Sequence, residues 1–166
     1  MKMHMRVYEK RPDICAVVHA RSTYGTIFAI AGIPLDAPIM SEAVVSLGCV
    51  PVAEYGTPST AEIPDSIEKY LPYYDAILLE HHGALTWSNT LEAAYMKMES
   101  LEFYAELIYR TKLLGVAREF DLEDIQKLYE VRRNMNMSGK HPATATAEEV
   151  AEAKKMGMQG YQYDFL

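Results

Sequence analysis

The sequence predicts a mixed α/β fold in a single domain that spans residues 1–166. Three observations support this class. Apolar residues make up 49% of the chain and charged residues 23%, which is typical of a globular protein. The length corresponds to about one domain. Short apolar runs rich in β-branched residues alternate with segments whose apolar residues recur at helical spacing, so both strands and helices are expected.

The first elements along the chain are short. Residues 3–10 are amphipathic and predict a helix that ends before Pro12. The stretch "ICAVVHA" at 14–20 is rich in β-branched residues and predicts a buried strand. The stretch "TIFAIAG" at 26–32 is apolar and fits either a helix or a strand, because its periodicity does not separate the two.

A helix and a strand follow. Residues 41–48, "SEAVVSLG", predict a helix that ends at Gly48, since glycine is the residue most often found just past a helix end. Residues 49–55, "CVPVAEY", predict a strand. Pro51 places this strand at an edge of the sheet, because proline cannot donate a hydrogen bond to an inner ladder.

The middle of the chain predicts one helix and two strands. Residues 60–71, "TAEIPDSIEKYL", predict a polar helix interrupted by Pro64. The runs "DAILLE" at 75–80 and "GALTW" at 83–87 predict two strands. Two histidines and a glycine separate these runs and form the corner between them.

The clearest helix is predicted over residues 89–114. Asn89, with Glu92 three residues later, resembles a capping box, and Gly115 is expected to stop the helix. Several of its apolar residues recur at helical spacing: Leu91, Ala94, Tyr95, Met98, Leu101 and Ala105. We interpret four of its larger side chains as packing against the sheet: Tyr95, Met96, Met98 and Phe103.

The C-terminal part predicts two more helices. The first covers residues 121–135 and begins with an acidic turn. A loop is predicted at 138–146, and a short helix follows at 147–157. Residues 161–166 are interpreted as a tail.

Charge and composition exclude several classes of partner. The formal net charge is -7 and there is no basic block, which argues against binding nucleic acid or an anionic membrane. The chain contains no apolar run long enough for a transmembrane helix and no signal peptide, so a cytoplasmic location is expected. Cys15 and Cys49 lie in apolar contexts and are interpreted as buried free thiols.

The stretch "LLEHHGALTW" at 78–87 points to chemistry, because two histidines follow an apolar strand and precede Gly83. His19 also ends an apolar strand. Zinc takes three or four nitrogen, oxygen or sulfur ligands at ~2.0–2.3 Å. Side chains two residues apart on a strand share a face, so a histidine at position 21 would complete a two-ligand clamp. That position holds Arg21, which has no lone pair for a metal.

These motifs are similar to those of a known family. The stretches are "MHMRVYEKRPDICAVVHARS", then "GIPLDAP" with "CVPVAEY" and "GTPSTAE", and finally "DAILLEHHGALTWSNTLEAAYMKMESLEFYAELIY". In this order they resemble the class II aldolase/adducin family, the zinc-dependent enzymes of the L-fuculose-phosphate aldolase type. The resemblance covers residues 1 to about 115, and the tail matches less clearly.

The resemblance implies a central, mainly antiparallel sheet flanked by helices on both faces. It also implies a homotetramer, zinc held by three histidines and a glutamate that serves as acid/base. Zinc in such a site acts as a Lewis acid on a phosphorylated ketose, which is cleaved to dihydroxyacetone phosphate and an aldehyde. By position, His19 matches the first ligand and His82 the third. His81 matches no ligand, and His4 and His141 are interpreted as surface residues.

The chain departs from the family pattern in three ways. Arg21 stands at the second ligand position. The glutamate of the family would fall upstream of Met1, and the family's N-terminal strands and phosphate-binding loops are expected to be missing. A sheet that lacks strands should expose apolar edges, so a partner segment is a further possibility. Five residues are interpreted as candidates for lining the site: Ser22, Tyr24, His81, Tyr161 and Tyr163.

Arg21 leaves three hypotheses open. The site is inactive, or water or Glu80 completes a weaker zinc site, or the guanidinium replaces the charge of the metal and holds an anion. We favour the first, because a ligand and the base are missing together. The functional alternatives are an impaired zinc-dependent aldehyde-lyase, a silent pseudo-aldolase that serves as an oligomeric or interaction domain, and an epimerase or dehydratase of the same family.

Overall fold

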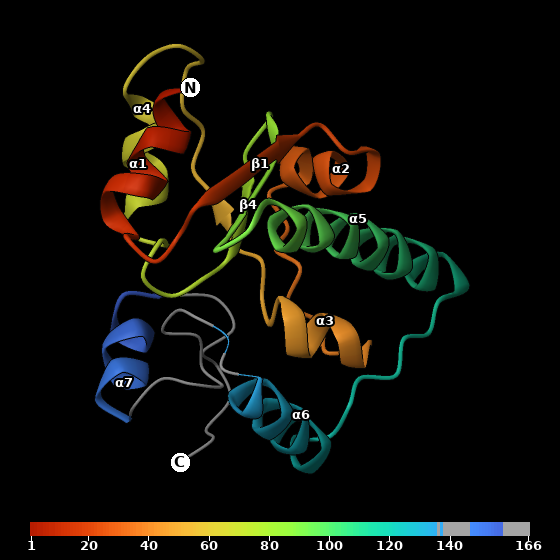
Figure 1. Ribbon diagram of the computed structural model, residues 1–166. Coiled ribbons are helices and arrows are strands. Elements are labelled where there is room, and N and C mark those ends of the chain that lie inside the picture. The colour runs from red at the N-terminus through yellow and green to blue at the C-terminus, as the bar shows by residue number, and fades with distance from the viewer. Residues whose placement is uncertain (136, 138–146, 158–166) are drawn as a thin grey trace.

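A central sheet lies between helices in the computed structural model, which describes residues 1–135, 137 and 147–157 (Figure 1). Within these residues the sheet has four strands in the order β1-β4-β3-β2. Strand β4 is antiparallel to both β1 and β3, and β2 is parallel to β3. The strands are β1 (Ala16–Ala20), β2 (Val52–Ala53), β3 (Ala76–Leu79) and β4 (Gly83–Ser88). The prediction of a mainly antiparallel sheet is therefore confirmed, and β2 lies at its edge.

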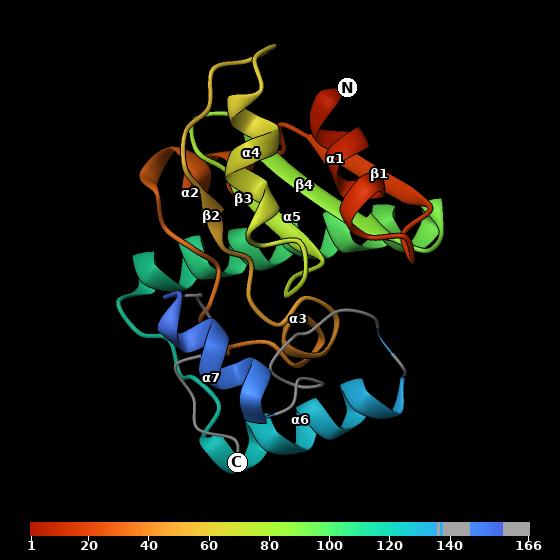
Figure 2. The same cartoon turned by 90° about the vertical axis from the view of Figure 1, so that its left-hand side faces the viewer.

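Helices cover both faces of the sheet. Figures 1 and 2 show α1 and α4 on one side of the sheet and α2 and α5 on the other, with α3, α6 and α7 gathered beyond one end. The helices are α1 (Lys2–Lys10), α2 (Thr23–Ala31), α3 (Ser41–Ser46), α4 (Glu62–Glu68), α5 (Leu91–Leu114), α6 (Leu122–Asn134) and α7 (Ala147–Lys155). None of the helices in the described parts of the chain is long and apolar enough to cross a bilayer. The loop predicted at 138–146 and the tail at 161–166 lie outside the described residues.

The alternation of side chains along the strands divides the core into two layers. The layer on the α1 and α4 side includes Met3, Val7, Val17, Ile63, Ile67, Ile77, Leu79, Leu85 and Trp87. The layer on the α2 and α5 side includes Phe28, Ala29, Ala76, Leu78, Ala84, Met98, Leu101 and Ala105. His19 lies two residues after Val17 on β1, so its side chain projects from the face that α1 and α4 cover.

Helices α2, α4 and α5 differ from the prediction in ways that have a clear physical reason. Residues 26–31 of the ambiguous segment belong to helix α2, which already begins at Thr23, and Gly32 caps its end. Pro64 does not interrupt α4, because it lies in the first turn, where its missing N–H is not needed. Helix α5 is capped by Thr90 and not by Asn89, because the Thr90 hydroxyl accepts a hydrogen bond from the Ala93 amide.

Two burial predictions were wrong. Cys49 is buried as expected, but Cys15 is exposed, since it lies just before β1 at one edge of the sheet. Helix α5 buries only one stripe of its surface against the sheet. Met98 belongs to that stripe, whereas Tyr95, Met96 and Phe103 are more than half exposed. The helical spacing indicated the helix correctly, but it did not show how wide its buried stripe is.

A buried cluster of charges lies between the start of β3 and helices α5 and α6. Asp75 is 1% exposed and precedes β3. One of its carboxylate oxygens lies 3.5 Å from Arg11, and the other lies 3.1 Å from Lys97 and 3.3 Å from Arg132. Burial lowers the pKa of the Lys97 ammonium, and Asp75 opposes this shift. Arg132 comes from α6, so this one carboxylate links α5, α6 and the segment between α1 and β1.

Candidate functional site

The corner between β3 and β4 places the predicted histidines at one end of the sheet. Gly83 has φ +146°, and a Cβ at this position would lie 2.6 Å from the carbonyl oxygen of Ala20. Only glycine fits there without a shift of the backbone. His81 has φ +55°, which is uncommon for a residue other than glycine. This tight corner brings His82 beside the end of β1, where His19 pairs with Leu85 in the register.

His19 and His82 face each other. Their ring centroids lie 4.8 Å apart, with the ring planes at 72°. The Nδ1 atom of His19 lies 2.9 Å from the carbonyl oxygen of Ala84. A carbonyl can only accept, so Nδ1 carries the proton and the neutral ring keeps a lone pair on Nε2. The Nδ1 atom of His82 is buried and has no hydrogen-bond partner among the described residues.

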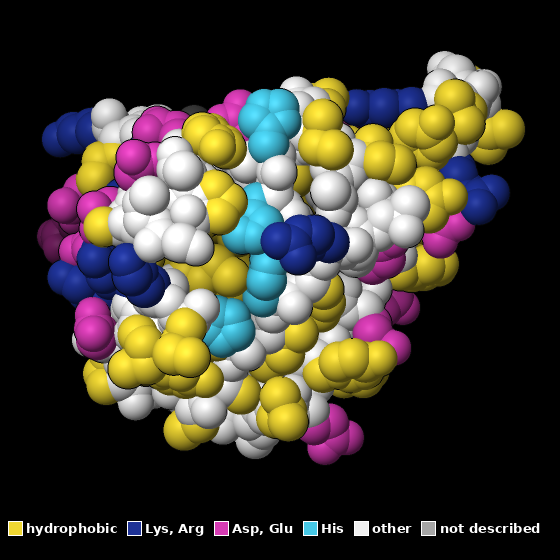
Figure 3. All heavy atoms as spheres, turned by 90° about the horizontal axis from the view of Figure 1, so that it is seen from above, with side chains coloured by type: hydrophobic (Ala, Val, Ile, Leu, Met, Phe, Trp, Pro, Cys, Tyr) yellow, Lys and Arg dark blue, Asp and Glu magenta, His cyan; other side chains and the backbone are white. Residues whose placement is uncertain are grey.

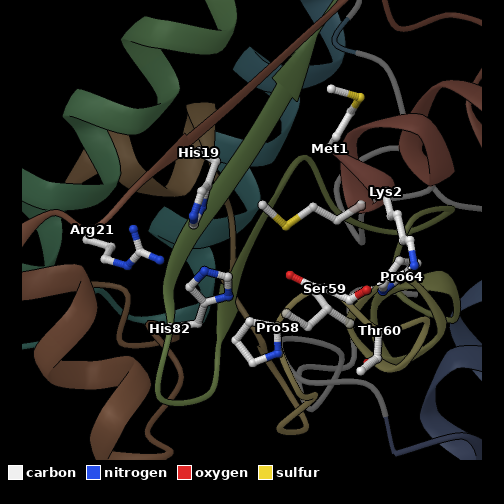
Figure 4. Close-up of a pocket in the computed structure, with 11 residues that line it drawn as sticks. Met1, Lys2, His19, Arg21, Pro58, Ser59, Thr60, Pro64 and His82 are labelled. Carbon is white, nitrogen blue, oxygen red and sulfur yellow. Dashed lines mark hydrogen bonds between the residues drawn. The ribbon is translucent and has the colours of Figure 1, made fainter.

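A pocket of about 440 Å³ opens in front of the two histidines. Figure 4 shows the Arg21 side chain extending toward His19 and His82 from one side, while Lys2 lies on the opposite side of the pocket. The remaining lining residues come from the start of α1, the loop before α4 and α4 itself: Met1, Met3, Pro58, Ser59, Thr60, Ile63 and Pro64. No acidic side chain is among the described residues that line this pocket.

The surroundings favour neutral imidazoles. Burial lowers the pKa of His19 below its ordinary value of 6.5, the hydrogen bond to Ala84 opposes this, and the positive charge of Arg21 adds to the lowering. Burial also lowers the pKa of His82, and charge on His19 and Arg21 acts in the same direction. Two neutral imidazoles beside a guanidinium therefore form the floor of the pocket near pH 7.

These lowered pKa values predict a pH-dependent stability. In the unfolded chain both histidines regain the ordinary pKa of 6.5, so below that pH the unfolded state binds more protons. Their contribution to stability is present above pH 6.5 and is lost as the pH falls through 6.5 toward the lowered folded values. Between about pH 7.5 and pH 5.5, the melting temperature of the wild type should fall further than that of a His19→Gln/His82→Gln variant, by on the order of 1–3 °C.

Differential scanning fluorimetry at several pH values would measure this difference. His81→Gln is the matched control, because His81 is exposed and does not line the pocket. Equal pH slopes for the wild type and the double variant would contradict the prediction.

Three of the other candidate residues lie away from the pocket. Ser22 precedes α2, and Tyr24 packs against Tyr109 on α5, with ring centroids 5.7 Å apart. The exposed His81 lies 6.1 Å from the ring of Tyr55. None of Ser22, Tyr24 and His81 lines the pocket. Tyr161, Tyr163 and His141 lie outside the described residues.

Several lining residues had no signal in the sequence. Lys2 and Ser59 are brought together when α1 packs on α4, and the Lys2 ammonium donates to the Ser59 carbonyl at 2.9 Å. Ser59 has φ +73°, an uncommon conformation that no local pattern predicts. His4, interpreted as a surface residue, is half-buried, and its pKa is lowered first by burial and also by charge on His19. Figure 3 shows the histidines of this face in a row with a basic side chain beside them.

The donor set does not fit a three-histidine zinc site. Zinc needs at least three lone-pair donors from the protein, and the pocket offers His19 and His82. Arg21 stands where the resemblance expects the second ligand, and it has no lone pair for a metal. Glu80 does not line the pocket, and its carboxylate accepts a hydrogen bond from the Tyr55 amide at 2.8 Å. In the parts of the chain that the structure describes, no three His, Cys, Asp or Glu side chains are grouped so that they could hold a metal.

Comparisons with known proteins identify relatives. Residues 1–109 match the family model described as Class II Aldolase and Adducin N-terminal domain. The chain is 30% identical over 135 residues to a 5-deoxy-D-ribulose 1-phosphate aldolase of Bacillus thuringiensis serovar kurstaki, covering 78% of this chain and 62% of the relative. It is 34% identical over 113 residues to a 3-oxo-tetronate 4-phosphate decarboxylase of Pectobacterium atrosepticum, covering 66% and 52%.

A solved structure of an L-fuculose 1-phosphate aldolase has the same fold, with a TM-score of 0.73 and 28% identity. The match covers 82% of this chain and 62% of that structure. The chain thus spans between about half and three fifths of the length of these relatives. The family model covers most of this chain and includes both His19 and His82. The chain belongs to the class II aldolase and adducin family.

Proposed function

We propose that this chain is a sugar-phosphate-binding member of the family in which zinc-dependent lyase activity is impaired. The reaction in question is the cleavage of a phosphorylated ketose to dihydroxyacetone phosphate and an aldehyde. The observation that carries the proposal is Arg21, which lines the same pocket as His19 and His82. By the resemblance, position 21 would hold the second zinc ligand. Phosphorylated sugars or sugar acids appear in the names of all three relatives described above, which supports the ligand class.

Arg21 opposes a zinc ion in two ways. It supplies no lone pair, so two imidazoles would have to hold the ion with solvent. Its positive charge also repels a dication, and this repulsion is strong in a partly desolvated pocket because the effective dielectric constant is low there. We therefore derive no catalytic step through zinc for this chain. Any activity that remains in this chain would be one of the reactions known in the family: that of an aldolase, epimerase, dehydratase or decarboxylase.

Zinc content tests this proposal directly. The purified wild type should contain well below one zinc per chain. An Arg21→His variant should contain about one, because residue 21 lines the same pocket as His19 and His82 and would supply a third imidazole donor. Elemental analysis after dialysis against zinc gives the stoichiometry, and a zinc-dependent rise in melting temperature gives an independent measure.

Two control variants make the zinc experiment specific. Arg21→Gln removes the positive charge that repels zinc but adds no imidazole ligand. It therefore shows how much of any gain in zinc binding comes from the loss of charge alone. A His82→Ala change in the Arg21→His background should remove the zinc again. About one zinc per chain in the wild type would contradict the proposal and favour an intact metal-dependent lyase.

A second candidate is a silent interaction domain, and exposed apolar side chains favour it. Those on α2 and α5 are Ile27, Ile30, Leu91, Tyr95, Met96, Phe103, Tyr109, Leu113 and Leu114. Clusters of exposed apolar residues commonly mark protein interfaces. Light scattering of the purified chain, compared with a Met96→Glu/Phe103→Glu variant, would test this role. The homotetramer and the cytoplasmic location expected from the sequence and the resemblance stay predictions.

A further inference from the structure

Arg21 is a pocket cation without a protein partner in the described part of the chain. No hydrogen bond or ion pair joins it to another described residue. Four other arginines each have a carboxylate neighbour: Arg6, Arg11, Arg110 and Arg132. A guanidinium is always charged near neutral pH and offers five donors in a planar fork. Its donors are therefore available to a ligand that enters the pocket.

The charge of the pocket is opposite to that of the whole chain. The chain has a formal net charge of -7, yet the described residues that line the pocket include Arg21 and Lys2 and no carboxylate. Lys2 uses one of its donors on the Ser59 carbonyl and keeps two. A concave surface lined by one sign of charge concentrates ligands of the opposite sign. The pocket is thus electrostatically suited to an anion and unsuited to a cation.

The backbone positions the guanidinium. A Cβ on Gly83 would lie 3.3 Å from both the Cα and the Cγ of Arg21, so the stem of the arginine lies against the bare backbone of the β3–β4 corner. From there the side chain extends toward the facing rings of His19 and His82 (Figure 4). The corner therefore holds the guanidinium at the end of the pocket where the histidines are, at a distance from Lys2.

We propose that Arg21 binds an oxyanion of the ligand directly, in the space between its guanidinium and the two histidines. The oxyanion is a carboxylate or a phosphate, since both accept two parallel hydrogen bonds from a guanidinium. A volume of about 440 Å³ accommodates a sugar phosphate or a phosphorylated sugar acid. The identity of the whole ligand rests on the proposed function, but the oxyanion site itself rests on Arg21, Lys2 and the absence of acid among the described lining residues.

Titration of the full chain with two simple anions tests the site. Inorganic phosphate and glycolate are added separately, and binding is followed by calorimetry and by the NMR signal of the Arg21 Nε–H. At least one anion should bind and shift that signal. Arg21→Ala should weaken its affinity roughly tenfold or more, because a hydrogen-bonded charge is lost. Arg118→Ala is the matched control and should bind as the wild type does, because Arg118 is exposed and lies outside the pocket.

The relative affinities identify the source of the oxyanion: tighter phosphate binding indicates a phosphate group, and tighter glycolate binding indicates a sugar acid. Arg21→Lys keeps the positive charge but loses the planar guanidinium with its paired donors, so it should bind the anion more weakly than the wild type does. This variant provides the test if Arg21→Ala does not fold. The inference is overturned if neither anion binds the wild type, or if the Arg21 variants bind as tightly as it does. Stoichiometric zinc in the wild type would instead overturn the proposed function, so the two failures are distinguishable.

Discussion

Replacement of Asp75 by alanine is expected to lower the free energy of unfolding by roughly 3–5 kcal/mol, because it removes from a buried ionic cluster the one carboxylate that three cations share. Asp75 is the carboxylate shared by Arg11, Lys97 and Arg132, and it is 1% exposed. Without it, three closely spaced cations would repel one another in a region that water barely reaches. Arg132 would keep its hydrogen bonds to the carbonyls of α3, but its ion pair with the residue that precedes β3 would be lost.

Urea denaturation, followed by circular dichroism, measures this loss. Asp13→Ala is a matched control, because Asp13 also pairs with Arg11 but its side chain is 43% exposed, and its cost should stay within about 1 kcal/mol. Lys97→Met should also cost less than Asp75→Ala, because it removes one of three like charges and keeps the volume and apolar character of the stem. Equal losses for Asp75→Ala and Asp13→Ala would contradict the assignment of Asp75 as the centre of the cluster.

Replacement of Gly83 by alanine is expected to cost about 2–4 kcal/mol, because it combines backbone strain with a steric clash. The φ of +146° is disfavoured for any L-residue, and the new Cβ would lie 2.6 Å from the Ala20 carbonyl oxygen. Backbone atoms cannot move aside as a flexible side chain can. The β3–β4 corner would therefore shift, and His82 and Arg21 would move relative to His19.

Gly115→Ala is the matched control for Gly83→Ala. Gly115 ends α5 with φ +76°, and a Cβ there would have no atom within 4 Å, so only the backbone strain of about 1–2 kcal/mol is expected. Thermal unfolding of both variants gives the difference in stability. NMR shifts of the His19 and His82 rings would show whether the site moves. A Gly83→Ala variant as stable as Gly115→Ala, with unshifted rings, would disprove the clash.

The amino-acid sequence by itself determined the types of most elements and a few of their ends. β-branched runs predicted β1 and β3, and helical spacing predicted α5. Gly48 and Gly115 marked helix ends, because positive φ is a local requirement that glycine meets best. The order of the motifs indicated the family, and His19 and His82 do lie together at one pocket. Their role as metal ligands stays a prediction.

Only the tertiary structure decided what surrounds the two histidines. Local pattern could not separate helix from strand at 26–32, because a short apolar run satisfies both until α5 packs on it. Nor could it show that Lys2 and Ser59 close the pocket, because these residues meet only when α1 packs on α4. The charge cluster around Asp75 arises in the same way, from segments far apart in the chain. A local pattern indicates which side chains of a segment are apolar and tend to be buried. The residues that contact those side chains depend on how distant segments fold onto the same sheet.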